Sequence, residues 1–184
     1  TRVQLAFVTL HDATPWSGER AASPPLLLLR GCADASLEHC RLSHALGCGI
    51  AAFTSTCRLL HTVVHGSHGA GLLAVGSDVT AAHCEFAFAS NGVLARDGAG
   101  VVMRGGTLRG NLVGARAQRS ARPFAGGRIT LESVACTDNG QFDVDADAFG
   151  TIELQGTTAR CHPLATARVQ ERRTPPAGQP AVPR

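Results

Sequence analysis

The sequence contains no lysine and no tyrosine, and it has only one tryptophan and one methionine. Aromatic residues make up 4% of the chain, so basic and aromatic residues do not alternate in the way that lets nucleic-acid bases stack on a protein. The formal net charge of +3 is also too small to favour contact with a phosphate backbone. We therefore do not expect nucleic acid as a partner.

Long apolar stretches are missing as well. No segment reaches the roughly 18 consecutive apolar residues that a membrane-spanning helix needs, so no membrane span is expected in this segment. The chain opens on a strand-like pattern rather than on a signal peptide, and we expect it to be part of a longer protein.

The seven cysteines are an odd number and include no Cys-x-x-Cys pair, which argues against a zinc site. Cys136 and Cys161 fall on successive predicted coils and could form a disulfide. For most of the seven, the simpler interpretation is a buried thiol that packs as a small apolar group.

The sequence does contain a repeat. Gly49, Gly71, Gly92 and Gly114 follow one another at intervals of 22, 21 and 22 residues, and the segments between them alternate short apolar strands with small-residue turns. A constant period of this length without a helical segment is typical of stacked strand-turn-strand coils. We predict an all-β fold, a right-handed single-stranded parallel β-helix of the pectin-lyase-like type, with six to seven coils of about 22 residues. A β-sandwich, the alternative, would not keep its glycines and apolar residues in phase over four units.

The predicted β-helix covers residues 1–162. Proline, glycine and charged residues interrupt the period at 11–24 and 118–127, and we interpret both segments as loops inserted at turns, where solenoids tolerate extra residues. Residues 163–184 are rich in proline and arginine and lack an apolar period, which predicts a linker or tail outside the core.

The order of segments over roughly residues 2–113 is distinctive. A strand (RVQLAFVTL) precedes a variable loop, and a proline-led run of leucines, a strand ending in His39-Cys40, the strand at Gly49-Ile50 and a coil starting at Val63 follow. This order resembles the extracellular β-helix region of fibrocystin-type proteins and of their relatives, the cell-surface hyaluronidases. The resemblance implies a large secreted or cell-surface protein, with the ciliary membrane or the cell coat as its location. The implied partners are other domains of the same chain, other surface proteins and glycans.

The chain departs from the hyaluronan-cleaving branch at the motif that carries its chemistry. That branch resembles Pro-Ile-His-Phe-His where this chain has proline followed by four leucines (25–29), and it tends to have an acidic pair where this chain has Ala74-Val75-Gly76. Leucine can neither transfer a proton nor hold a metal ion. The resemblance therefore implies a non-catalytic segment that acts as a rigid scaffold and recognition surface, with no cofactor.

Two groups of residues are candidates on the wall that follows each repeated glycine. Phe53, Leu73, Val75 and Leu94 should point outward and form an apolar face for a partner. Arg96 and Arg116 should lie one or two coils from three carboxylates, Asp143, Asp145 and Asp147. This cluster supports an alternative function, a carbohydrate-active lyase, hydrolase or epimerase, with calcium as its conceivable cofactor. A network of surface ion pairs is the simpler interpretation.

His39, His61 and His83 occupy the same turn position in three coils, so their rings should stack roughly 5 Å apart. A metal site or a pH switch is one interpretation, but three ligands on a straight column suit tetrahedral coordination poorly, and a ladder that supports the turns is preferred. Asn111 and Asn139 are predicted as turn residues, because asparagine tolerates left-handed backbone. A third functional possibility, an intracellular adaptor for other proteins, would be favoured by reduced cysteines.

Overall fold

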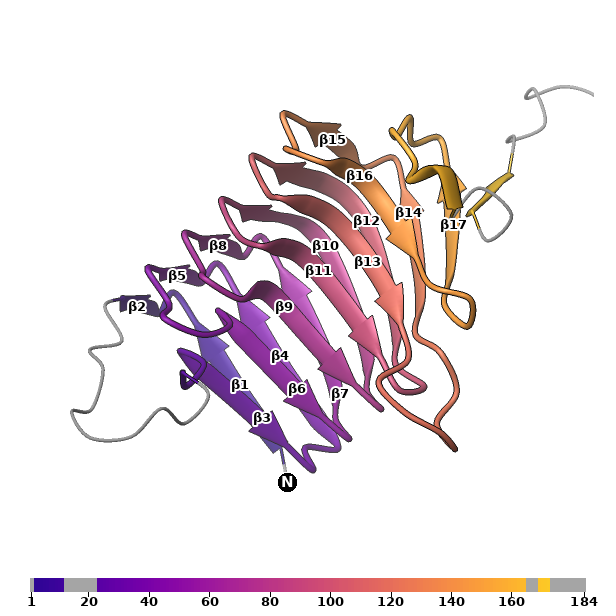
Figure 1. Ribbon diagram of the computed structural model, residues 1–184. Coiled ribbons are helices and arrows are strands. Elements are labelled where there is room, and N and C mark those ends of the chain that lie inside the picture. Colours follow the sequence, from indigo (N-terminus) through magenta and orange to yellow (C-terminus); the bar gives the residue numbers. More distant parts are fainter. Residues whose placement is uncertain (1, 12–22, 165–168, 173–184) are drawn as a thin grey trace, which may run out of the picture.

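The computed structural model describes residues 2–11 and 23–164, together with the backbone of residues 169–172. The strands form three walls that the chain visits in turn (Figure 1). The first wall contains β1 (Arg2–Ala6), β4 (Asp34–Glu38), β7 (Thr56–Leu60), the first halves of β10 (Asp78–Ala87) and β12 (Gly100–Arg109), β14 (Arg128–Glu132), β17 (Thr151–Gln155) and β18 (Val169–Arg172). The short wall contains β2 (Thr9–His11), β5 (Arg41–Ser43), β8 (Val63–His65), the second halves of β10 and β12, and β15 (Ala135–Thr137). The third wall contains β3 (Leu27–Arg30), β6 (Ile50–Phe53), β9 (Ala70–Val75), β11 (Asn91–Arg96), β13 (Val113–Gln118) and β16 (Phe142–Ala146).

All of these strands pair in parallel, each with the equivalent strand of the next coil. Leu72, for example, lies beside Ile50 of the preceding coil and Val93 of the following coil. The third wall has six strands, so the chain completes about six turns. The predicted parallel β-helix is confirmed, and the residues aligned by the repeat are direct neighbours in space.

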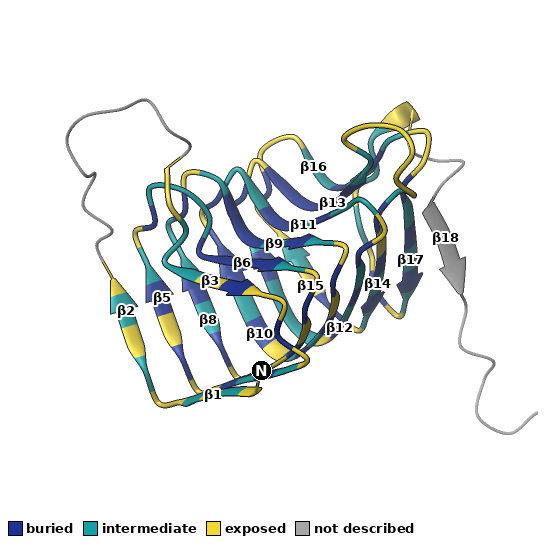
Figure 2. Ribbon diagram, turned by 90° about the horizontal axis from the view of Figure 1, so that it is seen from below, coloured by how far each residue is buried: buried dark blue, intermediate teal, exposed yellow. Residues whose placement is uncertain are grey.

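Inward side chains form continuous columns along the axis, because every second residue of a strand faces the interior. On the third wall, a column of mostly branched residues stands beside a column of alanines, and both are almost fully buried (Figure 2). The alanine column contains Ala52, Ala74, Ala95, Ala117 and Ala146. Small residues are needed there because the coil interior is narrow and close-packed.

The repeated glycine is required by the distance between coils. A Cβ atom added to Gly71 would lie 2.8 Å from the carbonyl oxygen of Gly92, and one added to Gly92 would lie 2.6 Å from that of Gly114. Both distances are shorter than a carbon–oxygen contact allows. The column ends at Asp143, which follows Gly114 in the stack and has no equivalent strand above it among the described residues.

The corners between walls are built from residues with left-handed backbone. At the corner between the first wall and the short wall, φ lies between 47° and 61° at one residue of each coil: Phe7, His39, His61, His83, Gly105, Ser133 and Gly156. The other two corners have the same feature, as at Thr54 and Phe88. Non-glycine residues adopt this conformation only when their surroundings compensate for its cost.

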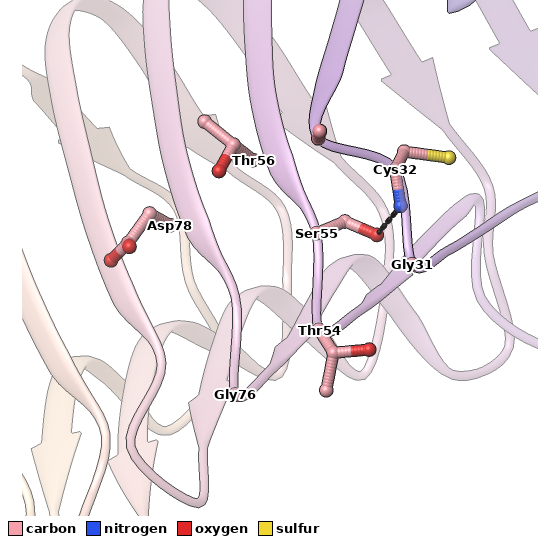
Figure 3. A pocket seen from close by; sticks show the side chains of 8 residues that line it. Gly31, Cys32, Thr54, Ser55, Thr56, Gly76 and Asp78 are labelled. Carbon is pink, nitrogen blue, oxygen red and sulfur yellow. Dashed lines mark hydrogen bonds between the residues drawn. The ribbon is translucent and has the colours of Figure 1, made fainter. Parts of the chain in front are cut away.

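The compensation comes partly from the next residue, which points inward and is often serine, threonine or cysteine. Its hydroxyl or thiol donates to the carbonyl oxygen two residues earlier: Ser55 Oγ to Phe53 at 2.8 Å, and Cys84 Sγ to Ala82 at 3.3 Å. Ser55 Oγ also accepts the backbone N–H of Cys32 from the coil below, at 3.1 Å (Figure 3). Each such residue thus closes its own corner and can join it to the neighbouring coil.

Asparagines play this part at the corner after the short wall. The left-handed residues there are Gly110 and Asp138, and the asparagines that follow them face inward. Asn111 and Asn139 do lie at turns, with the left-handed residue one position before each of them. Their amides bond carbonyl groups of the coil below, with Asn111 Nδ2 donating to the oxygen of Phe86 at 3.0 Å.

All seven cysteines lie in the described residues, and none of them forms a disulfide. Cys136 lies on the short wall beside Leu108, whereas Cys161 forms a bridge with Val144 of the third wall. The proposed Cys136–Cys161 disulfide is therefore wrong, because the two residues belong to different walls.

Two predicted boundaries change. The loop at 118–127 is present, but Gln118 still belongs to β13, and His11, the first residue of the loop predicted at 11–24, ends β2. Most of that loop, residues 12–22, lies outside the described residues. Within the predicted tail, β18 pairs with β17, so residues 169–172 continue the first wall. An edge strand offers unpaired backbone groups to any extended segment, even one with a weak apolar pattern.

Candidate functional site

The predicted apolar face lies on the outside of the third wall. Register confirms the two outward columns, since Leu73 lies beside Leu94 and Phe53 lies beside Val75. All four side chains are only half-exposed, because neighbouring coils are one strand spacing apart and shield each other. Ala51, in the same column as Leu73, is only 3% exposed, so the face does not extend to that position.

The polar end of this wall contains one close ion pair. Arg116 and Asp145 are neighbours in adjacent strands, with Arg116 Nη2 2.6 Å and Nε 2.8 Å from Asp145 Oδ2. The Asp145 side chain is 13% exposed, so this pair is partly shielded from water. Of the arginines and carboxylates predicted one or two coils apart, the structure thus brings Arg116 and Asp145 into contact.

The other two carboxylates are engaged by the backbone. Asp147 accepts the N–H groups of Arg119, Phe149 and Gly150 at 2.7–2.8 Å and so holds two loops together. Burial alone would raise the pKa of Asp147, but these three donors and the nearby Arg119 charge outweigh it and lower the pKa. An acid with a lowered pKa is poorly suited to donate a proton near neutral pH.

Asp143 stabilises the end of the stack. Its Oδ1 accepts from Asn139 Nδ2 at 2.7 Å, and its Oδ2 accepts the backbone N–H of Arg160 at 2.8 Å. Arg96 does not join the aspartates, because its register partner on β13 is Gln118 and its Nε is buried with no hydrogen-bond partner among the described residues. The predicted five-residue cluster is therefore one ion pair and two structural carboxylates.

A groove of about 620 Å³ lies beside the ion pair, lined by Arg116, Gln118, Asp145, Asp147, His162 and Leu164. His162 Nδ1 is 3.9 Å from Asp145 Oδ1 and accepts the backbone N–H of Leu164 at 3.1 Å. The imidazole and the carboxylate therefore share no hydrogen bond. Sequence reasoning missed His162, because it follows the last regular strand of the third wall and no repeat marks its position.

A second, smaller depression lies at the corner between the third wall and the first wall (Figure 3), with Thr54, Ser55, Thr56 and Asp78 among its lining residues. The backbone N–H of Ser55 donates to the hydroxyl of Ser77, so the depression is bordered by the hydrogen bonds of the corner itself. This hollow is a product of the turn geometry.

The predicted histidine ladder is present. The ring centroids of His39 and His61 are 4.9 Å apart and those of His61 and His83 are 5.2 Å apart, with interplanar angles of 16° and 12°. Phe7 extends the stack, 5.1 Å from His39, and Gly105 follows His83. Within the described part of the chain, no three histidine, cysteine or acidic side chains are placed to hold one metal ion, neither here nor at the aspartates.

No protein-family model matches this sequence, and no curated protein matches it either. In the part of the chain that the structure describes, no helix is both long and apolar enough to cross a bilayer.

Proposed function

We propose that this chain is a non-catalytic scaffold segment of a large cell-surface or secreted protein of the fibrocystin-like kind. It would hold other domains at fixed spacing and present its walls to partners. The ciliary membrane or the cell coat is the proposed location. The resemblance of the segment order over residues 2–113 supports this family and this location.

One observation supports the non-catalytic role above others. Each carboxylate of the polar cluster is bound by other groups of the protein. Asp145 is paired with Arg116, Asp147 accepts three backbone N–H groups, and Asp143 accepts hydrogen bonds from Asn139 and Arg160. A general acid or base must be able to exchange protons with a substrate, and bonds of this kind oppose that exchange. Stacked columns and parallel ladders, by contrast, suit a stiff spacer.

The spacer role can be tested by removing one coil. Deletion of residues 57–78 joins Thr56 to Val79, the residue that follows its register partner Asp78, and leaves every column in phase. The shortened protein should fold and should be shorter by one strand spacing of about 4.8 Å in small-angle scattering. Deletion of residues 57–67, which is out of phase, is the matched control and should prevent folding. If both deletions unfold the protein, the modular spacer is refuted.

The enzymatic alternative predicts turnover. We expect no depolymerisation of hyaluronan, pectate or alginate by the 184-residue chain, with or without calcium. If the parent chain cleaved one of these polysaccharides and the Asp145→Asn variant did not, the protein would be a carbohydrate-active enzyme that uses the groove beside Arg116, and the scaffold proposal would be wrong.

An intracellular adaptor is the second candidate, and the absence of a disulfide among the seven described cysteines favours it, since disulfides are rare in reducing compartments. Expression through the secretory pathway distinguishes the two. A surface protein should leave the cell folded with its cysteines still alkylatable after unfolding, whereas an adaptor should be retained or oxidised.

A further inference from the structure

Six of the eight histidines lie on or beside the short wall: His11 at the end of β2, and five others. His39, His61 and His83 stand at the corner where the chain enters this wall, His65 ends β8, and His44 stands at the corner where the chain leaves it. The rings of His44 and His65 are 6.2 Å apart. We call these five residues the histidine face.

The fixed charges around this face nearly cancel. Glu38 on β4 and Arg41 on β5 have opposite signs, and Glu85 on β10 is paired with Arg109 on β12 at 2.7 Å. Further along the stack, the Arg104 guanidinium is paired with the Glu132 carboxylate at 2.8 Å. Asp138 adds one negative charge two coils beyond Phe88, at the corner where the chain leaves the short wall. The net charge of the face therefore depends on its imidazoles, because histidine is the residue type whose charge changes most readily near neutral pH.

The ladder makes proton uptake and anion binding interdependent. His39, His61 and His83 are exposed, and since their rings are stacked face to face, their edges form a row along the corner. A protonated imidazole donates from both nitrogens. Imidazolium rings about 5 Å apart repel one another, and an anion lying along the row offsets that repulsion. Binding of the anion then favours protonation of the imidazoles, and protonation favours binding of the anion, as reciprocal coupling requires.

The shape of the face favours a single extended polyanion. The donors stand in single file along one corner, with the ring of Phe7, 80% exposed, at the end of the row. Phe88, 47% exposed, flanks His65 at the opposite corner, 4.7 Å away. Exposed aromatic rings pack against sugar rings, and charged groups on successive sugars would meet successive imidazoles. Sulfate groups remain ionised over the whole range in which histidine gains its charge.

We propose that the histidine face binds a sulfated polysaccharide at mildly acidic pH and releases it at neutral pH. This inference rests on the recognition role proposed above and assigns that role a surface and a ligand class.

Fluorescent dextran sulfate and the full 184-residue chain provide the test. Binding should be at least about ten-fold tighter at about pH 5.5 than at about pH 7.5, and it should weaken with added salt. Uncharged dextran should not bind. Equal affinity at the two pH values would overturn the proposal, and so would tighter binding to polyglutamate or to vesicles with anionic lipid.

The ladder is tested by the triple variant His39→Asn/His61→Asn/His83→Asn, because asparagine tolerates left-handed backbone and does not titrate. It should lose the pH dependence, while His68→Asn, beyond the second corner, should retain it. Circular dichroism at both pH values establishes that each variant is folded. A folded triple variant that binds like the parent chain contradicts the proposal. The coil deletion measures the length of the protein and not its binding. If the histidine face does not bind dextran sulfate, the proposed scaffold role is therefore still tested separately by that deletion.

Discussion

Asn139 accepts two hydrogen bonds from Asn111 of the preceding coil, one from its backbone N–H at 3.1 Å and one from its side-chain Nδ2 at 3.2 Å. Both amides are buried, with Asn111 1% and Asn139 4% exposed. The pair therefore links two coils at a corner where water cannot replace a lost partner.

The first prediction concerns the Asn111–Asn139 pair. Asn111→Ala should lower the free energy of unfolding by about 1–3 kcal/mol, because the buried N–H of Ala89 and the carbonyl of Phe86 lose their partners. Urea titration measures the change. Asn91→Ala is the matched control and should cost less, since the buried Oδ1 of Asn91 has no hydrogen-bond partner within the described residues. If both variants lost the same free energy of unfolding, the hydrogen bonds of the Asn111–Asn139 pair would contribute nothing specific.

The second prediction concerns the glycine column. Gly92→Ala should destabilise the fold by about 1–3 kcal/mol, since its Cβ would lie 2.6 Å from the carbonyl oxygen of Gly114 and the coils would have to separate. Gly100→Ala is the control: its Cβ would meet only the Asp78 carboxylate at 3.1 Å, and that side chain can rotate away. Thermal unfolding of the two variants should differ clearly, and similar midpoints would contradict the close-approach argument.

The third prediction concerns the buried thiols. Burial raises the pKa of Cys57 to about 12 and that of Cys84 to about 11, and nearby Cys32 and Cys84 contribute at Cys57. Burial, followed by the charge of Asp143, raises the pKa of Cys136 to about 12. Because the thiolate is the reactive form, iodoacetamide at about pH 8 should modify these three only after unfolding. Rapid labelling of the native protein at any of them would refute their burial as neutral thiols.

The fourth prediction is that the same pKa shifts make the folded state less stable at alkaline pH. The folded-state pKa of these thiols lies above the unfolded value of 9.0, so the folded state retains protons that the unfolded state releases. Their stabilising contribution is fully present below pH 9.0 and declines as the pH rises toward the folded-state values. Cys57→Ala should flatten the decline measured by urea titration above pH 9.0. An unchanged slope would contradict the prediction.

The fifth prediction concerns Asp147. Burial opposes ionisation of this group, but its three backbone donors prevail and its folded-state pKa is lowered. Its contribution is therefore present above the unfolded-state pKa of 3.8 and is lost as the pH falls through the folded-state pKa. Asp147→Asn should destabilise the protein at neutral pH, and the difference from the parent chain should shrink in acid. Asp138→Asn, at an exposed corner, is the control and should cost less stability at neutral pH.

The sequence predicted the coils because a period near 22 places equivalent residues one strand spacing apart. The same alignment placed Arg116 beside Asp145 and stacked His39, His61 and His83. These relationships depend only on the strand-to-strand repeat and on the alternation of side chains along a strand.

The corners were harder to predict because no residue type marks them. Phenylalanine, histidine, threonine, serine, aspartate and glycine all adopt left-handed backbone here. The usable signal is the following residue: Ser55, Thr62 and Cys84 each bond the carbonyl two residues earlier. His162 and β18 were missed for a different reason, since they lie after the last regular strand of the third wall, where neither the glycine nor the apolar column continues.

The bond from Cys84 to the Ala82 carbonyl is the same bond that Thr62 makes one coil earlier, with sulfur in place of oxygen. A thiol in this position serves as a hydrogen-bond donor, and no covalent link between coils is needed to keep the corner closed. A reducing agent should therefore leave these two corners closed, because the bonds that hold them do not depend on oxidation of sulfur.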